Sequence, residues 1–247
     1  SKCPKELTCQ DVRDFLLAKK DSGLKSTTLN LYNSALHFFY RNVLHILWDD
    51  TIVPRMIIER KLPAVLTSDE IDRLLEAVDD IKYRAMFATM YASGMRVSEV
   101  IHLHYNDISR TNMQIHVRDT KNRMDRYTIL SQRCLDLLTE YWFAYDKPMN
   151  WLFPKQHDKS RPIDTFYLSR HIHEHERRLG WPERITCHSF RHAFGTHLYE
   201  NGADLLTIQA YLGHKSLEST TIYVHLATSS MRKAISPFDM MGGDILE

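Results

Sequence analysis

The sequence predicts a mainly α-helical protein with a small antiparallel β-sheet. Most of the 247 residues lie in segments whose apolar side chains recur with helical spacing. One place alone alternates apolar and polar residues around a polar tip, as a β-hairpin does. A break at 54–66 divides the chain: Pro54 and Pro63 flank a charged stretch, and 67–70 then has the form of a capping box. We therefore expect a helical domain over 1–60 and a larger domain over 61–247.

The first domain is expected to contain two helices, over 7–20 and 27–47. Ser22 and Gly23 mark the turn between them. The predicted buried face of the second helix is Leu31, Ala35, Phe38 and Phe39. Two helices barely cover a core, so a partner surface or a missing segment is expected.

The second domain is expected to combine helices with the hairpin. Helical periodicity predicts segments over 69–78, 81–92, 96–103, 132–145, 165–179, 188–200 and 204–212. The strands of the hairpin are predicted over 114–118 and 126–130, with a basic tip between them.

Composition excludes several classes of protein. No apolar run reaches the roughly 18–20 residues of a membrane span, and the polar start is not a signal peptide. The four cysteines form no CxxC pair, so neither a zinc site nor a disulfide framework is indicated, and a reducing cytoplasm is expected. The net charge of +1 neither favours nor excludes a nucleic-acid partner, because local clusters of basic residues decide phosphate binding.

Cofactor motifs are also missing from the sequence. His171, His173 and His175 alternate along a predicted helix, whereas helical metal ligands usually lie four residues apart. His188 and His192 have that spacing but lack the glutamate of an HExxH motif. No Gly-rich phosphate loop of the GxxxxGK[ST] type is present, so ATP-driven chemistry is not expected.

The segment 187–226 carries the strongest chemical signal. His188 and Arg191 lie three residues apart in CHSFRHAFGTHL, and His214 and Tyr223 follow in LGHKSLESTTIYVHL. Three cation-capable side chains and a phenol suggest an oxyanion pocket beside a nucleophile. Upstream, the motif GMRVSE contains Arg96 behind a helix-breaking glycine, where the exposed N–H groups of a helix start favour anions.

In this order, the motifs resemble those of the tyrosine recombinases, or phage integrase family, which include bacterial Xer-type and integron-type enzymes. TKNRMDRYTIL, which contains Lys121, resembles the hairpin that carries the family's catalytic lysine. Residues 63–235 resemble the catalytic domain, and 7–50 resemble most of the helical, SAM-like core-binding domain. That domain's first helix is missing from this chain; a truncated chain and a natural absence both fit.

The resemblance implies strand cleavage by Tyr223, which would form a 3′-phosphotyrosyl bond and release a 5′-hydroxyl without ATP, cofactor or obligatory metal. A phenol has a pKa near 10, so it needs a base or a strongly cationic pocket at pH 7, and His188 is the expected proton acceptor. Lys121 would protonate the leaving 5′-oxygen. Arg96 and Arg191 would hold the phosphate oxygens. His214 would add a third donor, and the supporting acid would be Glu99.

The resemblance also implies a double-stranded DNA recombination site as the partner. Candidate DNA contacts are Lys25, Thr27, Arg41, Arg118 and Arg123. The tail from about 228 is expected to dock on a neighbouring copy within a homotetramer. Such an enzyme would act in integration, excision or resolution, in the bacterial cytoplasm with the nucleoid.

Each of these residues also has a purely structural interpretation when it is taken alone. A single tyrosine is more often a core residue, Arg96 could simply pair with Glu99, and His188 or His214 could cap a helix. Two further classes of protein fit the whole chain. A type IB topoisomerase-like enzyme would share the nucleophile chemistry, whereas a DNA-binding regulator of the same fold would not need Lys121 or Tyr223.

Overall fold

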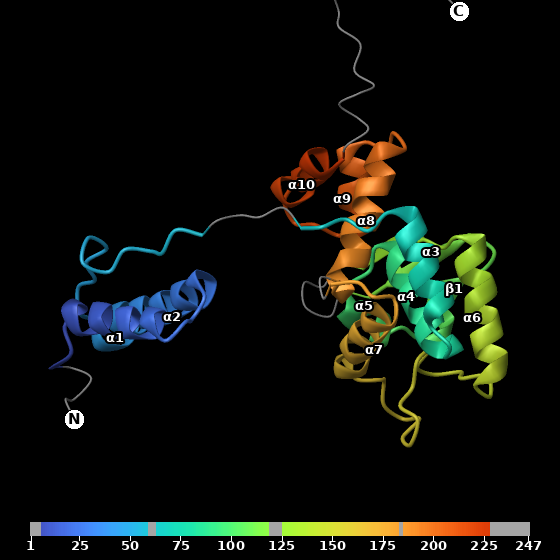
Figure 1. The fold of residues 1–247 in the computed structure, drawn as a ribbon, viewed down its shortest axis with the longest axis horizontal. Coiled ribbons are helices and arrows are strands. Elements are labelled where there is room, and N and C mark those ends of the chain that lie inside the picture. The colour runs from blue at the N-terminus through green and yellow to red at the C-terminus, as the bar shows by residue number, and fades with distance from the viewer. Residues whose placement is uncertain (1–5, 59–62, 119–124, 183–184, 228–247) are drawn as a thin grey trace, which may run out of the picture. The chain divides into compact units, whose positions relative to one another are not determined.

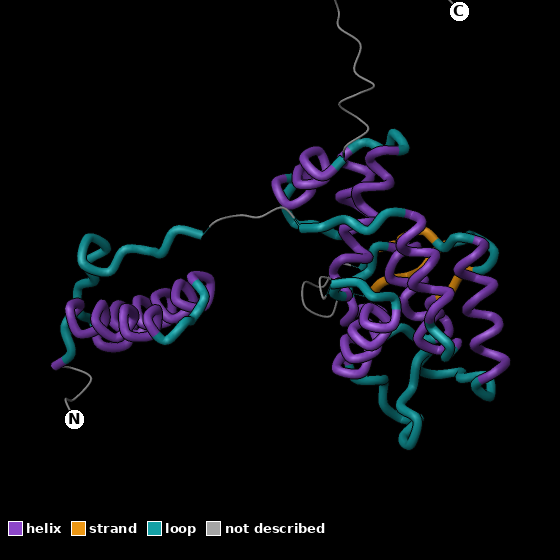
Figure 2. The backbone as a smooth tube through the Cα atoms, in the orientation of Figure 1, coloured by secondary structure: helices purple, strands orange, loops and turns teal. Residues whose placement is uncertain are grey.

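The chain consists of two units, Ser1–Lys61 and Leu62–Glu247, drawn in Figure 1. The computed structural model describes residues 6–58, 63–118, 125–182 and 185–227. Helices dominate both units, and one three-stranded antiparallel sheet lies in the second (Figure 2). The predicted fold class is confirmed.

The first unit packs two helices side by side, α1 (Cys9–Asp21) and α2 (Ser26–Phe39). A short π-helical turn, Tyr40–Leu44, continues α2. α1 begins at Thr8, whose hydroxyl accepts from the Asp11 N–H at 3.3 Å while the Asp11 carboxylate accepts from the Thr8 N–H at 2.8 Å. This reciprocal pair satisfies two backbone donors at the helix start and sets where α1 begins.

The buried face predicted for the second helix is wrong at Leu31, Ala35 and Phe38 and right at Phe39, which packs against the core. Leu31 and Phe38 are 66% and 65% exposed, whereas Leu29 and Tyr40 are buried in the core with Val12 and Leu16 of α1. The polar Asn33 is also buried, because its amide donates to the Val53 carbonyl at 3.2 Å. Apolar spacing alone could not identify this face, because it includes the polar Asn33, whose burial depends on a hydrogen bond.

In the second unit, helices pack around α4 (Ile81–Ser93), which is buried along most of its length. α6 (Gln132–Ala144) and α8 (Cys187–Glu200) make the most extensive contacts with α4. The remaining helices are α3 (Ser68–Ala77), α5 (Val97–Ile101), α7 (Thr165–Arg178), α9 (Leu205–Leu212), α10 (Glu218–Leu226) and the 3₁₀ turn Tyr105–Asp107.

The predicted capping box opens α3. The Thr67 hydroxyl accepts from the Glu70 N–H at 3.2 Å, and the Glu70 carboxylate accepts from the Thr67 N–H at 2.9 Å. The predicted helix over 96–103 is shorter in the structure, because Arg96 is its N-cap and the helix ends at Ile101.

The sheet has the order β1-β2-β3, formed by Ile108–Ser109, Gln114–Val117 and Arg126–Ile129. β2 and β3 are the predicted hairpin, with Ile115 opposite Thr128 and Val117 opposite Arg126. The sequence did not indicate β1, because two residues are too few to show an alternating pattern.

None of the helices in the described ranges combines the length and the apolar character that crossing a bilayer requires.

Candidate active site

Arg96 and Glu99 form one edge of the site at the start of α5. Gly94 ends α4 with φ +63°, a left-handed conformation that glycine adopts readily, and Arg96 then caps α5. The Glu99 carboxylate accepts from the Arg96 backbone N–H at 2.7 Å and from Arg96 Nη1 at 2.9 Å. The backbone and the side chain of Arg96 are therefore both held by one acid.

Gly94 also brings this edge against the C-terminal helices. A Cβ atom at position 94 would lie 2.3 Å from Cδ1 of Phe194 on α8 and 2.7 Å from Cδ2 of Leu212 on α9. Only a residue without a side chain permits this approach. The carbonyl of Gly94 accepts from Arg191 Nη1 at 2.7 Å. This bond connects the GMRVSE motif to the segment 187–226.

Arg191 lies on α8 and is 2% exposed. Besides the bond to Gly94, its Nη2 donates to the Leu212 carbonyl at 2.6 Å. Burial, together with the nearby Arg96 guanidinium, lowers the pKa of Arg191 to about 10, so the side chain is still charged at neutral pH. A guanidinium has five N–H bonds, and these two carbonyls account for two of them.

His188 lies on the same face of α8 as Arg191, about one turn earlier. Partial burial lowers its pKa, and the charges of Arg191 and Arg96 lower it further, while Glu99 opposes them. The imidazole is therefore neutral at pH 7 and able to accept a proton. It does not cap α8, because Thr186 holds that position, so capping does not explain this histidine.

His214 follows Gly213, whose left-handed backbone ends α9. Its Nδ1 lies 2.9 Å from the buried Thr220 hydroxyl of α10. Burial and the charges of Arg191, Arg96 and Arg126 lower the pKa of His214 to about 4. His214 is not the N-cap of α10, which is Leu217, so a capping role is wrong here too.

This low pKa predicts a pH-dependent stability. Between about pH 6.5 and 4, the unfolded imidazole takes up a proton that the folded one does not, so acidification lowers the free energy of unfolding. In urea titrations at pH 7 and pH 4.5, we expect His214→Gln to lose less stability on acidification than the wild type. His225→Gln, at an exposed position of α10, should behave like the wild type. An unchanged pH dependence in His214→Gln would contradict the assignment.

Tyr223 lies in the middle of α10 and is 1% exposed. Its ring lies over Gly195 of α8, where an added Cβ would come within 2.5 Å of the tyrosine Cζ, and it stacks nearly parallel to His214 at 6.3 Å. Burial raises the pKa of Tyr223, although Arg191 and Arg96 oppose this. The hydroxyl therefore needs a proton acceptor before it can attack at neutral pH.

The structure adds a residue that the sequence motifs did not mark. Arg126, the first residue of β3, donates Nη1 and Nη2 to the two oxygens of Glu99 at 2.9 and 2.8 Å, and Nε to the Tyr211 carbonyl at 2.8 Å. Its place directly after the hairpin tip was visible in the sequence, but its partners are 27 and 85 residues away.

A second residue near Tyr223 is His192, which lies within the motif CHSFRHAFGTHL but which the sequence indicates as structural. Its ring is close to those of both His188 and Tyr223, with centroids 5.7 and 6.2 Å away. Its Nδ1 is buried and has no hydrogen-bond partner among the described residues.

Six of the predicted site residues are thus brought into one region of the second unit. Shared carbonyls, ring contacts and mutual electrostatic effects connect Arg96, Glu99, His188, Arg191, His214 and Tyr223. Lys121 and Arg123, as well as the tail from 228, lie outside the described residues.

The predicted DNA contacts are divided between the two units. Lys25, Thr27 and Arg41 are exposed side chains of the first unit, at the start of α2 and in the π-helical turn. Arg118 is half exposed and pairs with the buried Asp107, with Nη2 2.7 Å from the carboxylate.

Within the described ranges, no three histidine, cysteine, aspartate or glutamate side chains gather as a metal ligand set would. The alternating histidines of α7 have other partners. His171 stacks on Tyr83 at 3.6 Å, and His173 Nδ1 lies 3.0 Å from the Glu176 carboxylate.

Similarity to known proteins agrees with this geometry. Residues 64–230 match the model of the phage integrase family. The integrase/recombinase y4eF of Sinorhizobium fredii is 35% identical over 94% of this chain and 92% of its own length. The tyrosine recombinase XerD of Yersinia pestis is 30% identical over 91% of this chain and 79% of its own length.

A solved structure shares the fold. The XerH site-specific recombinase, bound to a palindromic difH substrate in a post-cleavage complex, aligns with a TM-score of 0.77 at 23% identity, over 95% of this chain and 73% of XerH. The family match covers the residues that build the site described above, and the relatives extend over both units. The chain belongs to the phage integrase family, the tyrosine recombinases.

Proposed function

We propose that this protein is a site-specific DNA recombinase that cleaves and rejoins strands through a 3′-phosphotyrosyl intermediate. The observation that carries the proposal is the convergence of Arg96, Arg191, His188 and His214 on the surroundings of Tyr223. Cationic and imidazole donors beside a phenol suit the attack of that phenol on a phosphodiester.

In the cleavage step, the Tyr223 oxygen attacks phosphorus, an O–P bond forms, and the bond from phosphorus to the 5′-oxygen breaks. The tyrosine proton passes to His188, whose lowered pKa makes it a neutral acceptor at pH 7. Lys121 gives a proton to the departing 5′-oxygen. Rejoining reverses these transfers, and the phosphotyrosyl bond conserves the energy, so no ATP is needed.

The two arginines have different tasks in this mechanism. Arg96 remains 38% exposed and can face a phosphate directly. Arg191 is buried and already holds two backbone carbonyls, so its remaining N–H bonds would serve the phosphate from a fixed position. His214, neutral at pH 7, would contribute one N–H donor. Because Tyr223 is 1% exposed, we infer that α10 shifts when DNA binds.

We propose that the first unit is a core-binding domain and that the second is the catalytic domain. Lys25, Thr27 and Arg41 would contact phosphates from the first unit, and Arg118 and Arg123 from the second. Support comes from the exposure of the described members of this set and from XerH, which was solved bound to its difH site. DNA affinity should then fall with salt, by about 0.9 in log K per neutralised phosphate. We place the enzyme with the nucleoid in the bacterial cytoplasm.

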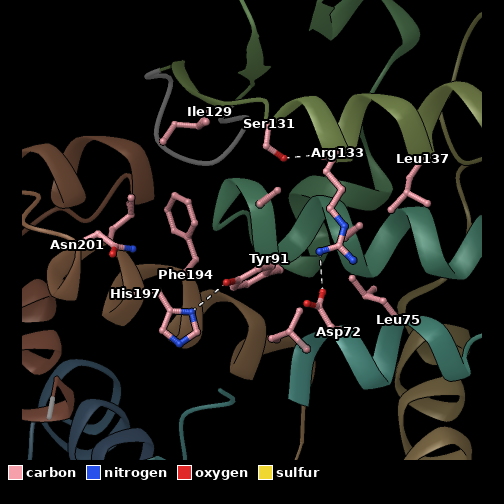
Figure 3. A pocket seen from close by; sticks show the side chains of 15 residues that line it. Asp72, Leu75, Tyr91, Ile129, Ser131, Arg133, Leu137, Phe194, His197 and Asn201 are labelled. Carbon is pink, nitrogen blue, oxygen red and sulfur yellow. Dashed lines mark hydrogen bonds and ion pairs between the residues drawn. The ribbon is translucent and has the colours of Figure 1, made fainter. Parts of the chain in front are cut away.

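We also propose assembly as a tetramer on DNA, with the tail after residue 227 docking on a neighbouring copy. The tail sequence contains the apolar residues Met231, Ile235, Phe238, Met240 and Met241. A recess of about 290 Å³ lies among α3, α4, α6 and α8 (Figure 3). Its apolar lining consists of Ile71, Leu75, Ala88, Tyr91, Ala92, Ile129, Cys134, Leu137, Phe194 and Leu198. Such a lining suits an apolar tail segment.

Deleting 228–247 should therefore weaken the joining of two DNA sites while single-site binding persists. Leu137→Glu, which places a charge in the recess, should have the same effect, and Leu206→Glu at a 66% exposed position should not. Sedimentation of complexes formed on one-site and two-site DNA measures this. Unchanged two-site assembly in the deletion variant would exclude tail exchange.

The function is tested by covalent capture. The probe is a nicked duplex that the wild-type protein selects from a randomised-sequence pool, with the nick placed so that the released 5′-hydroxyl strand diffuses away. A protein–DNA adduct on a denaturing gel is the expected result. A non-catalytic regulator would give no adduct from any pool.

A second assay separates recombination from topoisomerase activity. Plasmids carrying two copies of the captured duplex should yield joined or excised products. A type IB topoisomerase-like enzyme would instead give relaxed circles without any exchange between the two copies.

A further inference from the structure

Arg126 occupies the junction of three elements of the catalytic unit. As the first residue of β3, it joins the strand that leaves the hairpin to α5 through Glu99 and to α9 through the Tyr211 carbonyl. All three of its nitrogens donate hydrogen bonds, and its side chain is 11% exposed. The guanidinium is therefore bonded within the protein and largely covered, so we do not expect it to contact DNA.

Glu99 is held as a carboxylate by two arginines. Each of its oxygens accepts two hydrogen bonds: Oε1 from Arg96 Nη1 and Arg126 Nη1, and Oε2 from the Arg96 backbone N–H and Arg126 Nη2. Burial alone would raise the pKa of Glu99, but the hydrogen bonds and charge of Arg126, followed by those of Arg96, keep it below the usual range. Arg126 thus makes the larger contribution to the ionised state of Glu99.

The two arginines do not share Glu99 equally. Arg126 gives both ends of its fork to Glu99, whereas Arg96 gives one side-chain nitrogen and stays 38% exposed. Two guanidiniums share one carboxylate, so the trio keeps a net positive charge for a phosphate. Without Arg126, Arg96 would be the only described cation bonded to Glu99 and would be drawn toward it.

Arg126 also touches the turn that carries His214. Its Nε holds the Tyr211 carbonyl near the end of α9, and a Cβ at Gly213 would come within 2.9 Å of its Cδ. Leu212, in the same turn, accepts from Arg191. The position of the His214 ring therefore depends on a turn that both Arg126 and Arg191 hold by hydrogen bonds.

We propose that Arg126 is a positioning residue for strand cleavage: it holds Glu99 so that Arg96 stays directed at the scissile phosphate, and it anchors the turn before His214 to the strand behind the Lys121 hairpin. This inference rests on the proposed recombinase function. Arg126 acts through Glu99 and the turn rather than through contact with DNA.

The test measures covalent capture of the selected nicked duplex by Arg126→Ala, Arg126→Lys and Glu99→Gln, per molecule bound to DNA. By analogy with residues that orient catalytic ligands from the second layer of a site, we expect Arg126→Ala to lower the cleavage rate about 10–100-fold, while DNA affinity stays close to wild type. Lysine keeps the charge but cannot form the fork, so Arg126→Lys should recover only part of the rate.

Two further readouts separate positioning from a general structural role. The double variant Arg126→Ala/Glu99→Gln should lose no more activity than the more impaired single variant, because both changes break one unit. On acidification, the cleavage rate of Arg126→Ala should also begin to fall at a higher pH than the cleavage rate of the wild type. Glu99 faces Arg96 and Arg126 directly and Arg191 and His188 at longer range, so losing Arg126 raises the pH at which it protonates.

Arg178→Ala is the matched control. Arg178 pairs with Asp79 at 2.6 Å on the exposed surface of the same unit, so removing it should leave cleavage unchanged. Wild-type cleavage per bound molecule in both Arg126→Ala and Arg126→Lys would overturn the inference, as would additive losses in the double variant. If Arg126→Ala does not fold, the cleavage rate of Arg126→Lys and its pH dependence test the inference instead. Absence of any adduct with the wild type would instead contradict the proposed function itself.

Discussion

Replacing Tyr223 by phenylalanine should abolish covalent capture of DNA. The change removes one oxygen, the proposed nucleophile, and leaves the ring that packs on Gly195 and stacks on His214. The fold and DNA binding should therefore persist. By analogy with the loss of other covalent nucleophiles, the cleavage rate should fall on the order of 10⁶-fold, below detection on a denaturing gel.

A matched control is available in the same cluster. Tyr199 on α8 is a half-buried tyrosine packed against the Phe194–Tyr223 cluster, and Tyr199→Phe should still form the adduct. Gel-shift measurements at several salt concentrations would show that both variants bind the duplex equally. An adduct that survives in Tyr223→Phe would mean that another side chain attacks the phosphate, and the assignment of the nucleophile would be wrong.

Replacing Arg191 by alanine should have the second largest effect, because this side chain combines two roles. Loss of a phosphate donor should lower the cleavage rate on the order of 10²–10³-fold, by analogy with oxyanion-hole donors. Loss of the hydrogen bonds to the Gly94 and Leu212 carbonyls should also destabilise the fold, by about 1–3 kcal/mol for each buried acceptor left unpaired. Arg191→Lys keeps the charge, but an ammonium group lacks the planar fork that reaches both carbonyls. This variant should therefore recover activity only in part.

The two roles are separated by counting only folded, DNA-bound molecules. Urea unfolding gives the loss of stability, and the rate of adduct formation at saturating DNA gives the loss of catalysis. Arg84 is the matched control, because its Nε and Nη2 donate to the Val78 carbonyl at 2.9 and 2.7 Å, outside the candidate site. Arg84→Ala should lower stability without lowering cleavage per folded molecule. The catalytic role of Arg191 would be excluded if Arg191→Ala cleaved at the wild-type rate by the same measure.

Local sequence signals were sufficient for much of the fold. Thr67 and Glu70 predicted the start of α3, because a capping box is made by residues three apart. The hairpin over β2 and β3 was visible because its alternation is a property of neighbouring residues. The face of α2 was not, because the burial of Asn33 depends on a carbonyl 20 residues further along the chain.

The candidate site shows the same division. His188 and Arg191 share a helical face, so their proximity follows from spacing, and the order of the motifs was enough to indicate the family. Arg126 carried no such mark. Its role depends on Glu99 and Tyr211, which only the packing of β3 against α5 and α9 brings within hydrogen-bonding distance.

The sequence by itself determined the fold class and the family, and it predicted which side chains react, because local periodicity and the order of the motifs are properties of the sequence alone. The tertiary structure alone decided how those side chains are held: Arg191 between two carbonyls, Tyr223 buried over Gly195, and Glu99 shared by two arginines. The physical reason is that burial, pKa and hydrogen bonding depend on which distant segments pack together. In this chain, the segments that build the site are separated by about a hundred residues.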